Sequence, residues 1–485
     1  MPVPRLSARH PWSWSQRVLY AAIVPALAWW WWHDQRGFLL GMSVALMSLY
    51  AAIVGTKVVA VLVGLLRRHT LVVGAAELAA LSDDALPIYT VLVPLYREAA
   101  VASELVAALE RLDYPKDRLD AQLLLEEDDV ETIAHVRSLA LPDWLRVVVV
   151  PPGTPKTKPR ACNVGLAQAR GEFLVIFDAE DRPEPDQLKK AVAAFRRMPK
   201  KIACLQAKLN CYNRSRNLIT RWFTLEYTAW FDLYLPGLHA IGAPIPLGGT
   251  SNHFRSAVLR TLQGWDAFNV TEDCDLGMRL ERGGWRTRIL DSTTWEEAPS
   301  RWITWLKQRS RWMKGYWQTH LVHTREPLSC LIDLGPWKMA LMLFTVGGQV
   351  GSLLINPLCW VIGAMWLRHQ WTLFDPNHPW TVALVVATVA LLLSNLLFIL
   401  IHVLGALGRG FHNLVPFALL LPLYWAMLSV ATWRGFLQFF SAPFKWEKTP
   451  HGVPVRSATA VPAAAIAPAR TAAAIPPATR LTFVR

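Results

Sequence analysis

The fold is decided by the stretch EFLVIFDAED (residues 172–181), in which a short apolar run leads directly into three acidic residues. Aromatic and β-branched residues dominate the run, as is typical of a buried strand. Similar apolar runs lie upstream and alternate with segments of helical spacing. The expected strands are residues 90–93, 121–125, 147–150 and 172–177, and the expected helices are residues 101–112 and 161–169. This alternation predicts an α/β domain with a mostly parallel sheet and helices on both faces.

Two of the expected strands end in clusters of acidic residues. The strand at 121–125 runs into Glu126-Glu127-Asp128-Asp129, and the strand at 172–177 runs into Asp178-Ala179-Glu180-Asp181. Ligands of open α/β sheets gather at the carboxyl ends of strands, and crowded carboxylates repel one another unless a cation lies among them. An all-oxygen ligand set suits Mg²⁺ or Mn²⁺ rather than zinc. The pattern therefore predicts a divalent cation that holds a diphosphate, with a solvated acidic turn as the alternative.

Composition excludes several classes of protein. The chain has 485 residues, of which 53% are hydrophobic, and a net charge of +14. This apolar content excludes a disordered polyelectrolyte. The 6 cysteines include no C-x-x-C pair, which excludes a disulfide scaffold or a zinc ribbon. The positive excess lies largely beside the apolar segments and in the tail, where anionic lipid accounts for it. We therefore expect no nucleic-acid partner.

Apolar runs near both ends of the chain predict membrane-spanning helices. The N-terminal pair covers residues 19–32 and 37–56, and the C-terminal runs cover residues 339–367, 380–407 and 414–440. Basic residues flank the N-terminal pair, which places the central domain in the cytoplasm. The basic tail is expected there as well, which requires an even number of crossings. The run at 339–367 is either one tilted helix or a pair broken at Asn356-Pro357, and the even number favours the pair.

These segments divide the chain into four expected domains. They are an N-terminal transmembrane hairpin (residues 1–70), a cytoplasmic domain with interfacial helices (71–330), C-terminal transmembrane helices (331–443) and a cytoplasmic tail (444–485) that is disordered after about residue 453. The expected fold is thus a multi-pass α-helical membrane protein with an inserted cytoplasmic α/β domain.

Two further motifs lie downstream of the acidic clusters. Thr271-Glu272-Asp273 opens a helical stretch, although acids at a helix start are also ordinary caps. On a later helix Gln308, Arg311 and Trp312 fall at i, i+3 and i+4 and therefore share one face, whereas Arg309 points elsewhere. An arginine beside a tryptophan suits a diphosphate next to a stacked sugar ring. The alternative is an interfacial helix with a basic, aromatic face.

Taken in order, the motifs resemble those of processive family 2 glycosyltransferases, the membrane group that includes cellulose, hyaluronan, chitin and poly-N-acetylglucosamine synthases. The matching segments are residues 93–98, 126–129, 158–163, 178–181, 248–251, 271–273 and 308–312. Within the group the chain is most similar to bacterial exopolysaccharide synthases of the XagB type, whose DAED and WEKTxHG strings recur at 178–181 and 446–452. The resemblance implies that the cytoplasmic domain is a glycosyltransferase domain of GT-A type.

The resemblance also implies a role for each matching residue. Asp273 would be the general base that takes a proton from the acceptor hydroxyl. Asp178 and Glu180 would hold Mg²⁺ or Mn²⁺ on the donor diphosphate, and Asp181 could substitute for Glu180. Around the donor nucleotide, the substrate-binding residues would be Pro94, Tyr96 and Glu98, with one acid of the cluster Glu126, Glu127, Asp128 and Asp129 at the uracil. Lys158 and Asn163 would line the rest of the donor, and Arg311 would bind its diphosphate. Glu272 would lie beside the base, and Gln308 and Trp312 would lie at the acceptor. Residues 444–449 are similar in position to a loop that closes over the donor.

The function implied by the resemblance is inverting, metal-dependent transfer of a sugar from a UDP-sugar to a growing β-linked exopolysaccharide at the bacterial inner membrane, coupled to export. The expected partners are the UDP-sugar donor, the growing polysaccharide acceptor, membrane lipid and other exopolysaccharide assembly proteins. Two alternatives remain. One is the non-processive transfer of a single sugar to a polyprenyl-phosphate lipid, and the other is a catalytically inactive polysaccharide translocation or phage-receptor component.

Overall fold

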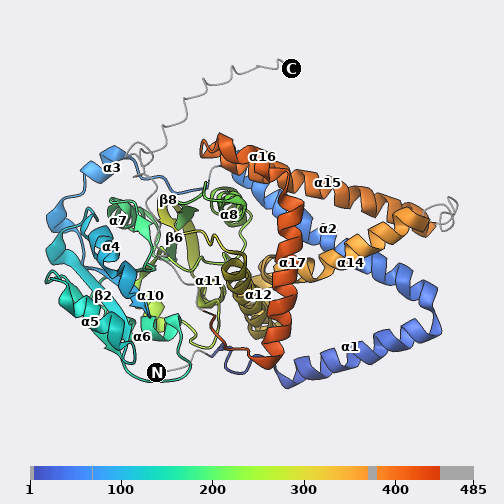
Figure 1. The fold of residues 1–485 in the computed structure, drawn as a ribbon, viewed down its shortest axis with the longest axis horizontal. Helices are drawn as coiled ribbons and strands as arrows, with labels where there is room; N and C mark the ends of the chain where they lie inside the picture. The colour runs from blue at the N-terminus through green and yellow to red at the C-terminus, as the bar shows by residue number, and fades with distance from the viewer. Residues whose placement is uncertain (1–4, 68, 370–378, 448–485) are drawn as a thin grey trace, which may run out of the picture.

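The computed structural model describes residues 5–67, 69–369 and 379–447 (Figure 1). An α/β domain occupies one side of the molecule, and long helices extend from it on the other side. The expected disordered tail after residue 453 lies outside the described residues. The cysteines are all buried and free of disulfide bonds.

In the described residues eight strands form one sheet, in the order β3-β2-β1-β4-β7-β6-β8-β5. The strands are β1 (Tyr89–Leu95), β2 (Leu119–Glu126), β3 (Leu145–Val150), β4 (Phe173–Ile176), β5 (Arg182–Pro183), β6 (Ile202–Cys211), β7 (Asn252–Arg255) and β8 (Arg286–Glu296). The first four are the strands expected from the apolar runs, and these predictions are confirmed.

The prediction of a mostly parallel sheet is confirmed for the majority of the strand pairs, although the sheet as a whole is mixed. Strands β1 to β4 are parallel to their neighbours among themselves, and β6 is parallel to β8. However, β7 is antiparallel to both β4 and β6, and β5 is antiparallel to β8. The chain enters β7 beside the carboxyl end of β4, where the Ser251 N–H donates to the Ile176 carbonyl at 2.8 Å. A strand that starts at that end must run back against its neighbour.

Helices cover both faces of the sheet, as the alternating side chains of buried strands require. Val91 and Val93 of β1 belong to a core with α4 (Ala99–Glu110) and α7 (Gln187–Arg197), whereas Leu92 between them belongs to a core with α6 (Lys158–Gln168). The remaining helices of the domain are α3 (Ala75–Ala79), η1 (Asp83–Ala85), η2 (Lys116–Arg118), α5 (Val130–Ser138), α8 (Leu218–Thr228), η3 (Ala229–Tyr234), α9 (Leu235–Ala240), α10 (Ser256–Thr261), α11 (Glu272–Arg282) and α12 (Trp302–Thr324).

The long helices come from both ends of the chain. They are α1 (Trp14–His33), α2 (Gln35–Arg67), α13 (Pro327–Met342), α14 (Gly348–His369), α15 (Pro379–Gly408) and α17 (Leu421–Ser441). The short segment η4 (Leu343–Gly347) lies between α13 and α14, and η5 (His412–Leu414) and α16 (Val415–Ala418) lie between α15 and α17. Helices α1 and α2 meet at Asp34 and diverge as a V (Figure 1). Two consecutive helices therefore lie where the N-terminal transmembrane hairpin is expected; that these helices cross a membrane as a pair stays a prediction.

Two helical segments of the described residues are long and apolar enough to cross a membrane, namely Gly37–Leu66 and Pro327–Val361. A third candidate is the pair His412–Ala418 and Leu421–Ser441, which is bent by 68° at its break. Helix α14 runs without interruption through Asn356 and Pro357, so the predicted break at these residues is wrong. A helix in an apolar environment can keep an internal proline where neighbouring groups bond the backbone around it, and the Trp433 indole donates to the nearby Leu354 carbonyl at 3.2 Å.

Candidate active site

A cavity of about 260 Å³ opens where β1, β2, β4 and β8 end. It brings together residues from motifs that lie far apart in the sequence. The predicted site residues that line it are Pro94, Tyr96, Glu98, Lys158, Asp178, Glu180, Glu272, Asp273, Gln308, Arg311 and Trp312. One cavity is therefore lined by residues from the acidic strand ends, from the Thr-Glu-Asp motif and from the Gln308–Trp312 face of the later helix.

The acidic turn after β4 sends two of its three carboxylates into the cavity. Asp178 and Glu180 line the cavity, whereas Asp181 folds back and accepts hydrogen bonds from the Asp178 N–H at 2.8 Å and from the Thr250 hydroxyl. The second carboxylate oxygen of Asp181 is buried, with no hydrogen-bond partner among the described residues. Burial and the neighbouring Asp178 raise the pKa values of both Glu180 and Asp181 well above their usual range. The turn thus places three carboxylates close together, and their mutual repulsion disfavours full ionisation unless a cation binds there.

The donor set fits a hard divalent cation. No group of three or more His, Cys, Asp or Glu side chains poised to hold a metal occurs in the described part of the chain. Mg²⁺ in nucleotide sites is usually bound by one or two carboxylates, with phosphate oxygens and waters completing the shell. Asp178 and Glu180, which both line the cavity, supply such a pair.

Lys158 connects the acidic turn to the Thr-Glu-Asp motif. Its ammonium group contacts the Asp178 carboxylate and donates to the Gly249 carbonyl at 2.7 Å. The Asp273 carboxylate lies against Gly249, since a Cβ at that glycine would stand 3.3 Å from an Asp273 oxygen. Burial lowers the pKa of Lys158, but Asp178 and Glu272 outweigh it and raise the pKa above its usual value. A charged lysine therefore stands between the two acidic motifs.

Asp273 is half-buried at the first turn of α11, and this partial desolvation raises its pKa. Desolvation raises the pKa of Asp273 above the usual value near 4, although the Cys274 N–H bond at 2.7 Å, Lys158 and Arg311 oppose the rise. The neighbouring Glu272 is buried, and burial together with Asp273 raises its pKa. The structure thus gives Asp273, the expected base, a pKa of about 6, closer to neutral pH than that of a free aspartate.

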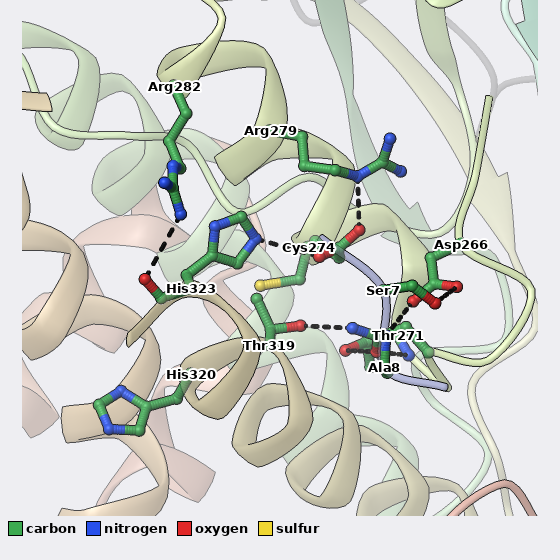
Figure 2. A network of polar contacts seen from close by, with 12 residues as sticks. Ser7, Ala8, Asp266, Thr271, Cys274, Arg279, Arg282, Thr319, His320 and His323 are labelled. Atoms are coloured by element: carbon green, nitrogen blue, oxygen red, sulfur yellow. Dashed lines mark hydrogen bonds and ion pairs between the residues drawn. The ribbon is translucent and has the colours of Figure 1, made fainter. Parts of the chain in front are cut away.

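A polar network behind the cavity fixes the start of α11 against α12 (Figure 2). Asp275, fully buried, accepts from Arg279 Nε at 2.7 Å and faces His323 Nε2 at 3.0 Å. Arg279 also donates to the carbonyls of Leu262 and Gly264, each at 2.9 Å. The charged side chains of this network thus hold the loop before α11 and the helix itself as one unit.

The loop before α11 is also held by the segment that precedes α1. The Asp266 carboxylate accepts from the Ser7 hydroxyl at 2.8 Å and from the Ala8 N–H at 2.5 Å, as Figure 2 shows. Three residues further on, Asn269 donates to the Thr319 hydroxyl of α12 at 2.9 Å and accepts from the Thr271 N–H at 3.0 Å. The residues before the first long helix are therefore part of the support of the Thr-Glu-Asp motif.

The Gln308, Arg311 and Trp312 face of α12 forms another wall of the cavity. The Trp312 ring stacks with the Tyr227 ring at 6.5 Å between centroids. The Arg311 guanidinium lies 4.3 Å from the centre of the Trp446 ring. Trp446 lies within the expected loop at 444–449 and lines the cavity itself, so the C-terminal segment reaches the site.

Close packing against α17 holds α12 in place. Gly435 of α17 lies so near α12 that a Cβ there would stand 2.4 Å from the Ser310 carbonyl oxygen. Lys314 bonds the end of α17, donating to Gln438 Oε1 at 3.0 Å and to the carbonyls of Ala442 and Lys445 at 3.1 and 2.9 Å. Arg309 does not line the cavity, but its guanidinium lies 4.4 Å from the centre of the Trp312 ring, so the prediction that it points away from this face is wrong in part.

Five predicted site residues lie outside the cavity lining, namely Glu127, Asp128, Asp129, Asn163 and Asp181. Asp129 caps α5 and accepts from the Arg97 N–H, and Asp128 accepts from Lys156 Nζ at 2.5 Å. Asn163 is bonded twice to the Trp265 backbone, at 2.7 and 2.9 Å. Asp129 is thus used as a helix cap, whereas Asp128 and Asn163 are bonded to residues far along the chain, so these side chains already have partners within the protein.

The cavity includes residues that the sequence did not single out. These are Lys156, Tyr227, Glu296 and Glu297; Glu126, one of the four cluster acids expected at the uracil, lines the cavity with them. Glu126 and Glu296 each end a strand, which was the signal used for the acidic turn after β4. The strand ending at Glu296 was not recognised, because its sequence RTRILDSTTWE carries polar residues throughout.

A family comparison matches the central part of the chain. Residues 87–315 match the sequence model of a family described as "Glycosyltransferase like family 2". The matched region runs from just before β1 to the middle of α12, and it contains all the residues that line the cavity except Trp446.

Two curated proteins are similar to about half of this chain. A probable glycosyltransferase of Bacillus subtilis, YdaM, is 28% identical over 233 residues, which cover 47% of this chain and 55% of that protein. The beta-monoglucosyldiacylglycerol synthase of Nostoc sp. is 26% identical over 244 residues, which cover 49% of this chain and 51% of that protein. The chain therefore spans about half the length of these curated relatives.

A solved structure is also similar in outline. It is the mannosyltransferase PcManGT of Pyrobaculum calidifontis in complex with GDP-Man and Mn²⁺, with 20% identity and a TM-score of 0.40 over 71% of this chain and 98% of that chain.

Proposed function

We propose that the chain transfers sugars from a UDP-sugar to a growing β-linked exopolysaccharide, with inversion at the anomeric carbon. Residues 87–315 support this proposal, because they match the model of glycosyltransferase family 2 and contain a mixed sheet of the GT-A type. One observation carries the proposal. Lys158 joins Asp178 to Gly249, against which Asp273 lies, so a cation-binding turn and a base flank one cavity.

The donor is held at the strand ends. Pro94, Tyr96 and Glu98 surround the nucleotide, and Glu126 replaces its three downstream neighbours as the cluster acid nearest the nucleotide, because it alone of the four lines the cavity. Asp178 and Glu180 hold Mg²⁺ or Mn²⁺, which when bound neutralises charge on the diphosphate. Lys158 and Arg311 add fixed positive charge close to the leaving group, where charge grows in the transition state.

Asp273 acts as the general base. It takes the proton of the acceptor hydroxyl as that oxygen attacks the anomeric carbon, and the bond to the diphosphate breaks on the opposite face. One base with no protein nucleophile gives a single displacement, so an α-linked donor yields a β-linkage. Glu272 raises the basicity of Asp273 through its negative charge whenever it is ionised, since like charges disfavour a second ionisation.

The acceptor sugar stacks on Trp312. The Tyr227 ring stacks with the Trp312 ring, and Gln308 on the same helix face provides an amide for a sugar hydroxyl. A stacked platform holds a sugar without consuming its hydroxyls, so a chain can shift by one residue and be extended again. This repeated use is the basis of the processive part of the proposal.

The proposed setting is a bacterial inner membrane, which the chain crosses several times, with the α/β domain (residues 71–330) on the cytoplasmic side. The candidate spans Gly37–Leu66 and Pro327–Val361 and the basic flanks support this orientation. A polar polymer cannot cross hydrocarbon unaided, so the expected function of the long helices is to accompany export together with other assembly proteins and lipid.

The test is transfer by the full-length chain in detergent, with individual radiolabelled UDP-sugars and the product resolved by size. Asp273→Asn should abolish transfer while UDP-sugar binding persists, and the control Glu131→Gln, an exposed carboxylate on α5, should behave as wild type. Equal turnover in the Asp273→Asn variant would remove the assignment of the base. A product that carries one sugar on a lipid would replace the processive proposal by the single-transfer alternative, which the name of the Nostoc relative favours.

A further inference from the structure

Trp312, the proposed platform for the acceptor sugar, packs against aromatic rings of α8. Its ring stacks with the Tyr227 ring at 6.5 Å between centroids and lies 6.1 Å from the Phe223 ring. Phe223 and Tyr227 are one helical turn apart and stack on each other at 4.5 Å. Tyr227 lines the cavity together with Trp312, whereas Phe223 is 1% exposed and belongs to the core. The platform therefore has an aromatic support that continues from the cavity into the core.

Arg309 adds to this support from the preceding turn of α12. It comes three residues before Trp312, which makes the two side chains neighbours on the helix surface. Its guanidinium carbon lies 4.4 Å from the centre of the Trp312 ring and 4.5 Å from the centre of the Phe223 ring. The side chain is 3% exposed and does not line the cavity. Arg309 thus contacts the platform from within the protein rather than from the cavity.

Glu226 of α8 fixes the guanidinium of Arg309 in this position. Glu226 Oε1 accepts from Nη1 at 3.0 Å, and Oε2 lies 2.6 Å from Nη2. Such a two-pronged pairing sets the plane of the guanidinium as well as its place. A guanidinium can pair with a carboxylate through its edge while its faces stack on aromatic rings, whereas an ammonium group cannot do both. A lysine at this position would therefore keep the charge beside Glu226 and lose the stacking.

We infer that Arg309 is a positioning residue that fixes the Trp312 ring as a platform for the acceptor sugar. This inference rests on the proposed function and deepens it at the acceptor end of the cavity. A ring that is already held in one orientation binds a sugar without the cost of ordering the side chain at that moment. Arg309 acts on the acceptor alone, because the donor diphosphate is held by groups that line the cavity, Arg311 and Lys158.

The experiment uses Arg309→Lys in the full-length chain in detergent, with the UDP-sugar that supports turnover. A processive enzyme releases its product when the acceptor leaves before the next transfer, so the mean product length reports how well the acceptor is held. This length, resolved on a gel at saturating donor, should fall about 3- to 10-fold, as the loss of a desolvated cation–π contact implies. The donor KM and the dissociation constant of UDP should stay within about twofold of wild type, since Arg309 does not reach the cavity.

The control is Arg255→Lys, which changes another stacked arginine. The Arg255 guanidinium also lies over two aromatic rings, that of Phe195 at 4.8 Å and that of Phe173 at 5.6 Å. It donates to the carbonyls of Ile202 and Phe195 and does not line the cavity. This variant should keep the product length and the donor KM of wild type.

The outcomes separate the inference from the function beneath it. A product of wild-type length in a folded Arg309→Lys variant would overturn the inference while the glycosyltransferase proposal stands. So would a donor KM that rises together with the loss of length, because Arg311 lies on the same helix and would move with a displaced α12. If Arg309→Lys melts well below wild type, the double variant Glu226→Leu with Arg309→Met, which leaves neither charge unpaired, carries the same comparison. A wild-type chain that adds a single sugar, or none, would overturn the proposed function, and the inference with it.

Discussion

Glu226 provides the sharpest test of how the α/β domain is joined to the long helices. Its carboxylate accepts from Arg309 Nη1 at 3.0 Å and lies 2.6 Å from Nη2, and the Tyr424 hydroxyl donates to it at 2.7 Å. The Tyr424 oxygen in turn accepts from the Trp305 indole at 3.2 Å. One carboxylate on α8 therefore ties α12 to α17.

The cost of removing this carboxylate follows from burial. The Arg309 side chain is 3% exposed and that of Glu226 is 22% exposed, so neither charge is well hydrated. Removing one partner of a buried pair leaves an uncompensated charge and destabilises a protein by about 3–5 kcal/mol. Because Glu226 keeps some contact with solvent, Glu226→Gln should cost about 3 kcal/mol, and the displaced α12 should lower transfer as well.

The assay is thermal and denaturant unfolding of the purified chain in detergent, followed by tryptophan fluorescence. The double variant Glu226→Leu with Arg309→Met removes both charges and should be more stable than Glu226→Gln alone. Glu104→Gln is the matched control, since its pair with Arg182 is 75% and 48% exposed and should contribute less than about 1 kcal/mol. The reasoning would be refuted if Glu226→Gln lowered the free energy of unfolding by less than about 1 kcal/mol, or if the double variant were less stable than Glu226→Gln.

Four further predictions concern the site. Burial raises the pKa of Asp273, and the base acts in its ionised form, so kcat should fall as pH drops through a value clearly above 4; a pH–rate profile that stays flat down to pH 4 contradicts this. Chelation with EDTA should abolish transfer, and added Mg²⁺ or Mn²⁺ should restore it; full activity after exhaustive chelation excludes the cation. Trp446→Ala removes a cation–π contact with Arg311 worth about 0.5–2 kcal/mol, so the donor KM should rise about 2- to 30-fold in steady-state assays, and an unchanged KM argues against a closing loop. Gly435→Val places atoms on the Ser310 carbonyl and should cost about 1–3 kcal/mol, measured as a lower melting temperature; a variant as stable as wild type shows that α12 and α17 can separate freely.

The first half of the sheet could be predicted from sequence because its strands are buried on both faces. Val91, Leu92 and Val93 are all fully buried, so the apolar run is continuous and stands out against its surroundings. The strands of the second half of the sheet could not be predicted from the sequence in this way. Strand β7 has only four residues, and β8 carries Ser292, Thr293 and Thr294, whose hydroxyls are buried in hydrogen bonds that a hydropathy pattern does not register.

The candidate site was predictable where acids directly follow an apolar strand, as at Asp178, or where a spacing fixes a helix face, as at Arg311 and Trp312. It was not predictable where local bonds decide the direction of a side chain. Asp181 is three residues from Asp178, yet its bonds to Thr250 and to the Asp178 N–H turn it away from the cavity. No sequence spacing indicates that choice, because Thr250 lies about 70 residues further along the chain, in the segment before β7.

The bonds of Asp266 with Ser7 and Ala8, and those of Lys314 with the end of α17, limit how this protein can be dissected. A fragment cut at residues 71 and 330 would keep every cavity residue of the matched family region but would leave both side chains without these partners. A soluble excised enzyme is therefore a poor starting point for biochemistry. Grafting the domain onto another set of helices would require these anchoring contacts to be transplanted with it.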